Sequence, residues 1–510
     1  MVTKIISGAV AGISGYLVTV ETDLSPGLPS FDVVGLPDSA VKEARERVRA
    51  AVKNAGFDFP VKRITVNLAP AATKKEGSAF DLPIALGVLA GCGVIKAEAL
   101  RDALFLGELS LDGEIKPVSG VLPIIHGAFQ AGVDSFIVPM KNGEEAALVA
   151  GAAVYAAPDL SVLVNLLKTG NLEKIRRENT EKQRGAQDEE EFAGVRGQDS
   201  LKRAFLVAAA GAHNLIMSGP PGSGKTMMAK RMPGILPPLG FEESMEVTKI
   251  YSVAGLLDGA GSLMRKSPFR APHHTSPYSA VTGGGGYPRP GEISLAHNGV
   301  LFLDELPEFH RDVLEALRQP LEDGFITVTR TKAKLVYPAD FMLLAAMNPC
   351  PCGYLGNLDK CRCTPAEVAR YQRKISGPLL DRIDIQIDVS PVKYNELAEA
   401  QEKERAKPVS MRERVIRARA VQKERYKGRG AALNSRLGAE GVEKYCRLDA
   451  AGRDMLRMAF DSLGLSARAY HKILKVARTV ADLDEAENIS VRHVAEAISY
   501  RSLDRRISGQ

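Results

Sequence analysis

The sequence lacks any apolar run long enough to cross a bilayer, so we expect no membrane association. An uncharged stretch at residues 5–20 resembles a secretory signal, but Gly8, Gly12 and Gly15 interrupt it, and it therefore predicts a strand and a turn. Cysteine is also scarce. Four of the 6 cysteines lie between positions 350 and 363 rather than forming a disulfide framework, and the cytoplasm is the expected compartment.

A strong net charge is missing as well. The formal charge of +6 is too small for 510 residues to indicate a nucleic-acid partner by itself, so the local distribution of charge must decide. The chain is 45% hydrophobic and 25% charged, which excludes disordered and fibrous classes. Its length allows three or four domains.

Pattern changes along the chain predict four parts. Over residues 1–168, short apolar runs bounded by glycines alternate with helical patterns, which predicts an α/β domain. A polar segment at 169–191 is typical of a linker. Strand and helix patterns alternate over 192–390, which indicates a parallel sheet flanked by helices. Residues 391–510 show almost no strand signal and predict an all-helical lid.

A phosphate-binding pattern, G-x-x-x-x-G-K-[ST], follows a short apolar run at 215–217. Its glycines allow backbone N–H groups to face phosphates, its lysine neutralises the β and γ oxygens, and its threonine hydroxyl is a ligand for Mg²⁺. The sequence therefore predicts ATP and Mg²⁺ as cofactors. The residues are Gly219, Pro220, Pro221, Gly222, Ser223, Gly224, Lys225 and Thr226.

A second motif at 300–305 combines a buried-strand pattern with two carboxylates, Asp304 and Glu305. Asp304 is expected to hold Mg²⁺ and Glu305 to orient the attacking water in phosphoryl transfer. The strand pattern at 341–347 ends in Asn348, whose amide we expect to contact the γ-phosphate and that water; the alternative is an ordinary turn asparagine. Together these motifs predict an ATPase.

Arg382 precedes a strand pattern, where it would be unpaired in its own subunit and could reach the γ-phosphate of a neighbour in a ring. The alternative is a pair with Asp381 or Asp384. In the helical lid, Arg468 is the expected nucleotide-contacting arginine, with Arg478 as the rival.

Cys350, Cys352, Cys361 and Cys363 could close a tetrahedral zinc site, although C-x-C spacing is less usual than C-x-x-C and free thiols are the alternative. The neighbouring pair of histidines at 273–274 has no nearby carboxylate in sequence and predicts a loop that touches a ligand or DNA.

Basic residues lie at a predicted turn between the β-rich segments 325–329 and 335–337. Arg330, Lys332 and Lys334 would give this hairpin a cationic tip that binds DNA through its phosphates without sequence preference. The alternative is a merely solvated hairpin.

Four stretches resemble the Mg-chelatase-like AAA+ ATPases of bacteria, of the ComM (YifB) type, and the resemblance covers essentially the whole chain. It implies a homohexameric ring that moves along single-stranded or branched DNA and migrates branches during homologous recombination, as in natural transformation, with recombination proteins as possible partners. It also implies that the hairpin at 325–337 and an insertion at 269–289 face the pore. The stretches are PFRAPHHT at 268–275, PGEISLAHNG at 290–299, NPCPCG at 348–353 and ARTVADL at 477–483.

The N-terminal domain is similar to the Lon protease (S5-type) domain, but Ala79 stands at the nucleophile position and Leu122 at the lysine position. Proteolysis is therefore not expected, and a shifted dyad of Ser78 with Lys74 or Lys75 would aim the side chain differently. A DNA translocase is the predicted function. The alternatives are the motor subunit of a metal chelatase and an ATP-dependent protease-like remodeller.

Overall fold

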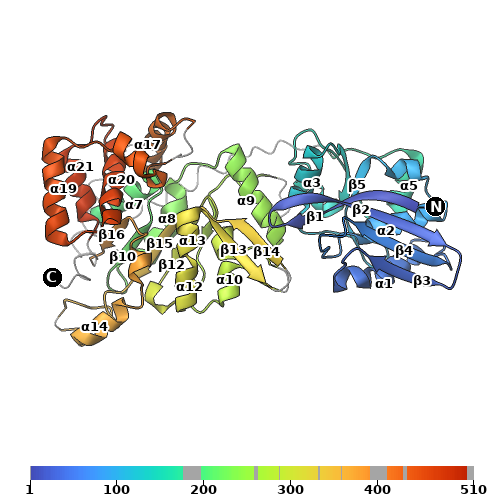
Figure 1. Cartoon of the computed structure of the whole chain (residues 1–510), viewed down its shortest axis with the longest axis horizontal. Helices are drawn as coiled ribbons and strands as arrows, with labels where there is room; N and C mark the ends of the chain where they lie inside the picture. The colour runs from blue at the N-terminus through green and yellow to red at the C-terminus, as the bar shows by residue number, and fades with distance from the viewer. Residues whose placement is uncertain are drawn as a thin grey trace. The chain divides into compact units, whose positions relative to one another are not determined.

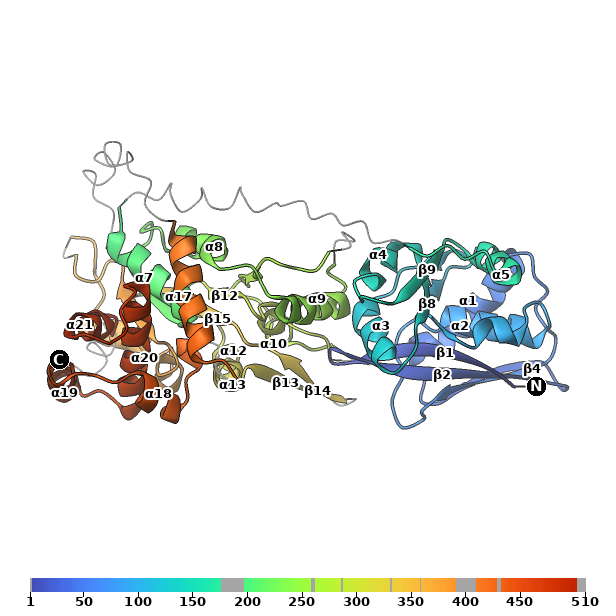
Figure 2. The same cartoon turned by 90° about the horizontal axis from the view of Figure 1, so that it is seen from above.

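The computed structural model describes residues 2–175, 197–257, 262–285, 288–330, 333–357, 359–390, 410–428 and 433–501 (Figures 1 and 2). The chain forms two compact units. The N-terminal unit comprises Met1–Glu181 and Phe241–Met264, and the C-terminal unit comprises Lys182–Gly240 and Arg265–Gln510. Most of the expected linker lies outside the described residues. Among the described residues, no helix is both long and apolar enough to cross a membrane.

The N-terminal unit is built on a mixed seven-stranded sheet in the order β3-β4-β2-β1-β5-β8-β9. The first two strands pair antiparallel through a turn at Gly12, which has a φ of 65°, and this confirms the strand and turn expected near the N-terminus. The strands are β1 (Val2–Ala11), β2 (Ser14–Ser25), β3 (Ser30–Val34), β4 (Arg63–Ala69), β5 (Ala103–Phe105), β8 (Ser135–Pro139) and β9 (Ala153–Ala157).

Helices pack on this sheet through residues spaced three to four apart. In α1, Val41, Ala44 and Val48 are buried along one face, and the carboxylate of Asp38 accepts a hydrogen bond from the Val41 N–H at 2.8 Å. Gly15 permits the close approach of α3, because a Cβ there would lie 2.1 Å from the Pro123 carbonyl oxygen. The main helices are α1 (Ser39–Asn54), α2 (Asp81–Gly91), α3 (Val121–Gln130), α4 (Gly143–Ala146) and α5 (Leu160–Thr169).

One helix of the N-terminal unit comes from much later in the chain. Helix α9 (Phe241–Ala254) lies between the two nucleotide motifs in sequence but packs against α3. The Ser252 carbonyl accepts from the Gly120 N–H at 3.0 Å, and the Ser252 hydroxyl donates to Glu145 at 2.5 Å. The segment 192–390 therefore contributes to both units, which its sequence pattern did not indicate.

The C-terminal unit contains the expected parallel sheet, in the order β11-β12-β15-β10-β16. Strands β12, β15 and β10 are buried along their whole length, as parallel strands covered on both faces should be. The edge strand β11 was not predicted. The strands are β10 (Leu215–Ser218), β11 (Phe269–Arg270), β12 (Val300–Leu303), β15 (Met342–Met347) and β16 (Ile385–Asp388).

Short helices and one hairpin complete this part of the unit. The predicted hairpin is confirmed as an antiparallel pair, β13 (Phe325–Arg330) and β14 (Ala333–Pro338), whose turn residues 331–332 lie outside the described residues. The helices are α7 (Asp199–Gly211), α8 (Lys225–Ile235), α10 (Tyr278–Thr282), α11 (Glu292–Leu295), α12 (Arg311–Ala316), α13 (Arg318–Asp323), α14 (Pro365–Gln372) and α15 (Gly377–Leu380).

The last part of the chain is helical, as its sequence predicts. Helices α17 and α20 pack on α7 and on each other, and Asp482 of α20 accepts hydrogen bonds from Arg425 of α17. These helices are α17 (Met411–Arg425), α18 (Ala439–Tyr445), α19 (Ala450–Leu463), α20 (Ala467–Leu483) and α21 (Val491–Ser499).

Candidate active site

The phosphate-binding pattern forms a loop between β10 and α8. Gly222 and Gly224 have φ values of 77° and 84°, a region that side chains disfavour, so the loop needs glycine at both positions. The Lys225 ammonium lies inside this loop and donates to the carbonyl oxygens of Gly219 at 2.7 Å and Pro220 at 2.9 Å. Burial lowers the pKa of Lys225. The ammonium is therefore held where the loop can receive phosphate oxygens.

The two nucleotide motifs meet at one hydrogen bond. The Thr226 hydroxyl donates to Oδ2 of Asp304 at 2.6 Å, and the other carboxylate oxygen accepts from the Glu305 N–H at 3.0 Å. Thr226 is the second residue of α8 and Asp304 follows β12, so residues 78 positions apart converge at the carboxyl ends of parallel strands. A hydroxyl and a carboxylate at this distance form the kind of oxygen ligand pair that Mg²⁺ prefers.

Glu305 has a neighbour that sequence reasoning missed. Oε2 of Glu305 lies 3.4 Å from Nδ1 of His274, and the His274 ring packs edge-on against Phe309. Glu305 has a φ of 51°, unusual for a residue with a side chain, and its side chain is 52% exposed. The signal in the sequence was indirect: His274 follows β11, which pairs with β12, the strand that ends just before Asp304 and Glu305.

Asn348 directly follows β15, the strand between β12 and β10, and so lies at the same edge of the sheet as both motifs. A Cβ built on Gly353 would lie 3.7 Å from Cγ of Asn348 and 2.6 Å from Cδ of Pro221. Asn348 and the phosphate loop thus flank the same glycine.

Arg382 is paired within its own subunit, which corrects the expectation that it would be unpaired. Its guanidinium donates to Glu322 at the end of α13 and to the Pro378 carbonyl at 2.5 Å. The partner is neither Asp381 nor Asp384, because Asp384 instead pairs with Lys472 at 2.7 Å. The pair was unpredictable from sequence, since Glu322 lies 60 positions away.

The two lid arginines have different environments. Nη2 of Arg468 lies 4.0 Å from the same Glu322 oxygen that contacts Arg382, and the Arg468 side chain is 63% exposed. The hydrogen bond from Arg382 is the main cause that lowers the pKa of Glu322. Arg478 is buried, and its guanidinium donates to Asp482, Ala486 and Glu487 within the lid. Of these two arginines, only Arg468 remains accessible to a ligand.

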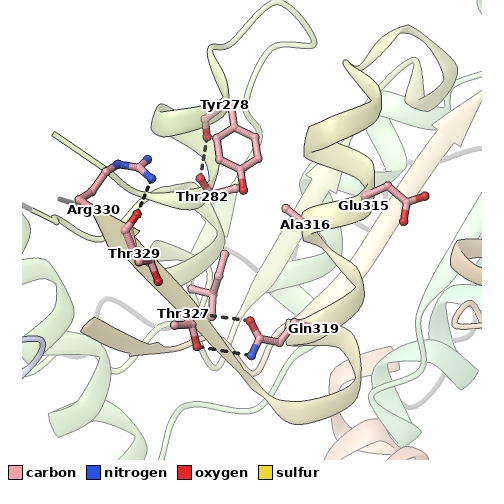
Figure 3. A pocket seen from close by; sticks show the side chains of 10 residues that line it. Tyr278, Thr282, Glu315, Ala316, Gln319, Thr327, Thr329 and Arg330 are labelled. Atoms are coloured by element: carbon pink, nitrogen blue, oxygen red, sulfur yellow. Dashed lines mark hydrogen bonds between the residues drawn. The ribbon is translucent and has the colours of Figure 1, made fainter. Parts of the chain in front are cut away.

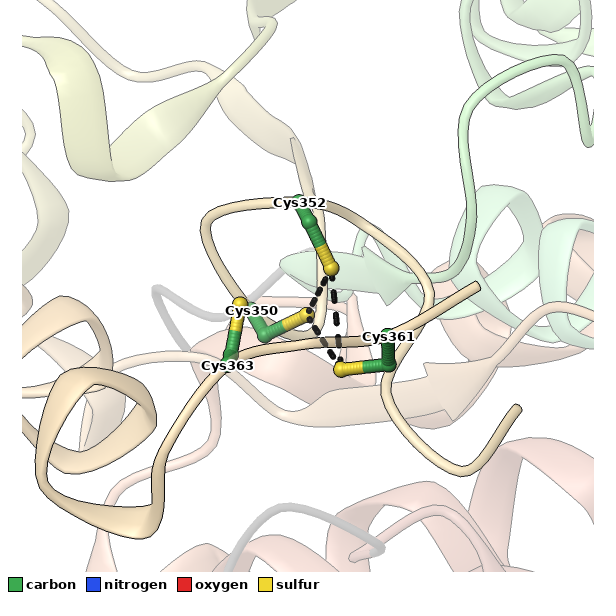
Figure 4. Close-up of side chains that lie close together, drawn as sticks. All are labelled: Cys350, Cys352, Cys361 and Cys363. Carbon is green, nitrogen blue, oxygen red and sulfur yellow. Dashed lines mark hydrogen bonds between the residues drawn. The ribbon is translucent and has the colours of Figure 1, made fainter. Parts of the chain in front are cut away.

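The four cysteines converge (Figure 4). Their sulfur atoms all lie within 4.8 Å of one another, and three pairs measure 3.4, 3.9 and 3.6 Å. A tetrahedral zinc site with Zn–S bonds of about 2.3 Å places its sulfurs about 3.8 Å apart, so the cluster fits this geometry. A hydrogen bond from the Tyr354 backbone is the main cause that lowers the pKa of Cys352 to about 6. For Cys361 and Cys363 a backbone hydrogen bond acts in the same direction, but desolvation and hydrogen bonds to the neighbouring thiols outweigh it and raise the pKa, so the fit to zinc rests on the sulfur separations.

The hairpin carries two of its three predicted DNA-binding residues within the described part of the chain. The Arg330 guanidinium donates to the carbonyl oxygens of Thr329 at 2.9 Å and Gly283 at 3.0 Å, and Lys334 is exposed. Lys332 lies outside the described residues. A pocket of about 270 Å³ opens beside β13, between α10 and α12 (Figure 3). Its wall includes Tyr278 and Gln319, and the Gln319 amide bonds to Thr327.

The Lon-like positions contain no pairing of a nucleophile with a lysine. Leu122 is buried in an apolar cluster against which Ala79 packs. The Ser78 hydroxyl donates to Glu108, whereas Lys74 pairs with Glu76 and the Lys75 ammonium donates to the Pro70 carbonyl. Ser78 is thus engaged by a carboxylate rather than by either candidate lysine.

A phosphate loop and an Asp-Glu pair at the carboxyl edge of a parallel sheet define a P-loop nucleotide-binding protein of the AAA+ class. Residues 191–397 match the family "Magnesium chelatase, subunit ChlI", residues 406–501 match its C-terminal family, and residues 20–142 match "Subunit ChlI of Mg-chelatase". The chain belongs to this Mg-chelatase-like AAA+ family and to its ComM type.

Relatives match along nearly the whole chain. It is 43% identical over 505 residues to competence protein ComM of Haemophilus influenzae, covering 98% of this chain and 97% of that protein. It is 42% identical over 499 residues to YifB of Salmonella typhimurium, covering 98% and 96%. A Lon protease of Azorhizobium caulinodans is 26% identical over 145 residues, covering 26% of this chain and 16% of the protease. The predicted family and fold class are confirmed.

Proposed function

We propose that the chain is an ATPase whose nucleotide site joins the phosphate loop to the Asp-Glu pair. The observation that carries the proposal is the 2.6 Å hydrogen bond from Thr226 to Asp304, because the same two oxygens would hold Mg²⁺ on the phosphates of ATP. Lys225 neutralises phosphate charge, Glu305 orients the attacking water, and Asn348 contacts the γ-phosphate and that water.

The ATPase acts as a homohexameric ring, in which Arg382 reaches the γ-phosphate of a neighbouring subunit. Arg468 contacts the nucleotide from the helical lid, residues 391–510. The proximity of Arg382 and Arg468 to Glu322 supports a shared role, because this carboxylate holds two cationic side chains from distant segments close together. On binding of the neighbour's nucleotide, phosphate replaces Glu322 as their anionic partner.

The ring moves along single-stranded or branched DNA and drives branch migration in homologous recombination in the cytoplasm, as in natural transformation. Full-length similarity to a competence protein supports this function. The hairpin supports it too, because Arg330 and the exposed Lys334 provide cations for phosphate contacts. Lys332 is the third proposed contact. The N-terminal Lon-like domain, residues 1–168, is proteolytically inactive, as Ala79 and Leu122 imply.

Zinc bound by the four cysteines completes the proposed set of cofactors with ATP and Mg²⁺. The fit between the sulfur separations and a tetrahedral site supports it.

A branch-migration and strand-displacement assay tests the proposed function. Purified protein with ATP and Mg²⁺ should convert a synthetic Holliday-type junction and a forked duplex to products, whereas Glu305→Gln protein should bind both and convert neither. ATP hydrolysis without any DNA processing would overturn the proposed DNA function.

A chelatase motor is the second candidate, because the family matches at 191–397 and 406–501 are magnesium-chelatase matches. The N-terminal unit does not separate the two candidates, because residues 20–142 also match a family described as a subunit of Mg-chelatase, but the full-length similarity to a competence protein favours the DNA motor. DNA separates the two candidates: it should stimulate turnover of a DNA motor and leave that of a chelatase motor unchanged.

A further inference from the structure

The loop that holds the four cysteines, residues 349–364, connects β15 to α14 and has almost no apolar support. Pro349 and Cys350 are buried at its start, but among its described residues from 351 to 364 Gly353 is the only one that is buried. Side-chain packing therefore cannot fix the course of this loop. Its backbone hydrogen bonds are mostly local, such as the 2.8 Å bond from the Cys361 N–H to the Asn357 carbonyl.

The cysteines are placed at the two ends of this loop. Cys350 and Cys352 follow β15, and Cys361 and Cys363 precede Thr364, the residue that caps α14. An ion bound by all four thiolates would close the loop on itself and supply the order that packing does not, as structural zinc does in small domains.

The same loop touches the nucleotide site at one glycine. A Cβ on Gly353 would lie 2.6 Å from Cδ of Pro221 in the phosphate loop, closer than real Cβ contacts come. The same Cβ position lies 3.7 Å from Cγ of Asn348. Because Gly353 adjoins Cys352, and Asn348 precedes Cys350 by two residues, fixing those two sulfurs fixes the backbone on both sides of this contact.

We propose that the metal-bound loop is a positioning element of the ATPase: the ion, zinc by its geometry, holds Gly353 against Pro221 and so fixes the side chain of Asn348 relative to the phosphate loop. The inference rests on the proposed ATPase function and adds a role for the metal. Loss of the ion leaves the parallel sheet folded but releases Asn348.

Two single variants, Cys361→Ser and Cys363→Ser, test the proposal, because these two ligands lie farthest in sequence from Asn348. Wild-type protein should contain about one zinc per chain by elemental analysis, and each variant much less. The variants should become sensitive to protease within residues 351–364. Cys92→Ser, which removes an exposed cysteine of the N-terminal unit, is the matched control and should retain zinc and protease resistance.

Kinetics test the link to Asn348. The turnover number of the zinc-depleted variants should fall about tenfold or more, since small displacements of catalytic groups have effects of this size. ADP affinity should change little. Combining Cys361→Ser with Asn348→Ala should cost no more than Asn348→Ala alone, because both changes remove the same function. Additive losses, or full turnover without zinc, would overturn the proposal.

The Gly353→Ala variant tests the contact between Gly353 and Pro221 independently of metal binding. This variant keeps four thiolates and should keep its zinc, yet the added Cβ meets Pro221 and stands at a φ of 85° that side chains disfavour, so turnover should fall as in the cysteine variants. Wild-type turnover in Gly353→Ala protein would contradict the contact. If wild-type protein hydrolyses no ATP, the proposed function fails and the positioning role fails with it. Elemental analysis and protease protection would still decide whether zinc orders the loop.

Discussion

Nδ1 of His274 lies 3.4 Å from Oε2 of Glu305, the residue proposed to orient the attacking water. The side chain of Glu305 is 52% exposed, and without this contact its carboxylate could rotate freely in water. The contact with His274 therefore restricts the orientation of the carboxylate. His274 is itself placed by the ring of Phe309, at a centroid distance of 6.4 Å. We therefore expect His274 to position Glu305 in the proposed hydrolysis.

Replacing His274 with Ala should lower the ATPase turnover number about tenfold and leave the KM for ATP nearly unchanged, because orientation of Glu305 matters after ATP is bound. Steady-state kinetics measure both constants. His274→Asn retains a hydrogen-bond donor and should recover part of the loss. A KM that rises as much as turnover falls would indicate general damage to the site instead.

Lys225→Ala and Glu305→Gln should separate binding from chemistry. Without Lys225 the phosphate loop loses its cation, and ATP binding should fall below detection in a fluorescent-nucleotide titration. Glu305→Gln should bind ATP normally and hydrolyse it about 10²-fold or more slowly, since it keeps the shape of the side chain but not the charge. Wild-type turnover in this variant would refute the role of Glu305.

Arg382 should act across a subunit interface, so mixed rings test it. Rings of Arg382→Ala or Lys225→Ala subunits alone should hydrolyse little ATP, since an arginine of this kind contributes about 10³ to 10⁵ in rate. Mixing the two should restore activity at interfaces where an intact Arg382 faces an intact Lys225. Mixed rings, verified by affinity tags, that show no recovery at any ratio would count against the assignment.

Local patterns predicted much of the fold and of the nucleotide motifs. The helix at Ala467–Leu483 and the phosphate loop depend on residues close together in sequence, so periodicity and turn chemistry suffice for them. Pairs between distant segments carry no such signal. Glu322 and Arg382 are 60 positions apart, and the docking of α9 in the N-terminal unit requires contacts with Gly120 and Glu145.

Asp384 should stabilise the C-terminal unit at neutral pH. It is buried, and its carboxylate lies 2.7 Å from Lys472 and 3.1 Å from His213. Burial raises its pKa, but the charge of Lys472 and the His213 hydrogen bond outweigh this and lower the pKa below the ordinary value of 3.8. A depressed carboxyl pKa contributes stability above that ordinary value, and the contribution is lost as pH falls through the folded-state pKa.

Asp384→Asn should therefore lower the apparent melting temperature at pH 7, because about 3–5 kcal/mol is lost when a buried charge loses its partner. The deficit relative to wild type should narrow as pH falls below 3.8, because the carboxylate then gains a proton in the unfolded chain while it stays charged in the folded one, and the stabilisation shrinks until the folded-state pKa is reached. Asp381→Asn, three positions earlier, is the control and should melt like wild type. A deficit that is the same at every pH would contradict the charge assignment.

The cationic hairpin should hold DNA through its phosphates. Lys334 is exposed on β14, and the Arg330 guanidinium at the end of β13 is positioned by two carbonyl oxygens. Each lysine that neutralises a phosphate releases counterions, so binding should weaken steeply with salt and show little sequence preference. Replacing Lys332 and Lys334 with Ala should lower the slope of log affinity against log salt by about 0.7 to 0.9 for each phosphate that is no longer neutralised.

Fluorescence anisotropy at several salt concentrations measures this slope, and ATPase activity without DNA should remain at its wild-type value. A variant with Lys53 and Lys62 replaced by Ala removes the same charge from exposed positions of the N-terminal unit, so it should bind DNA with the wild-type slope. If the hairpin variant instead kept full affinity and an unchanged slope, the hairpin would not contact DNA. The basic segment at 412–429 would then be the next surface to test, since Arg417, Lys423 and Lys427 are exposed there.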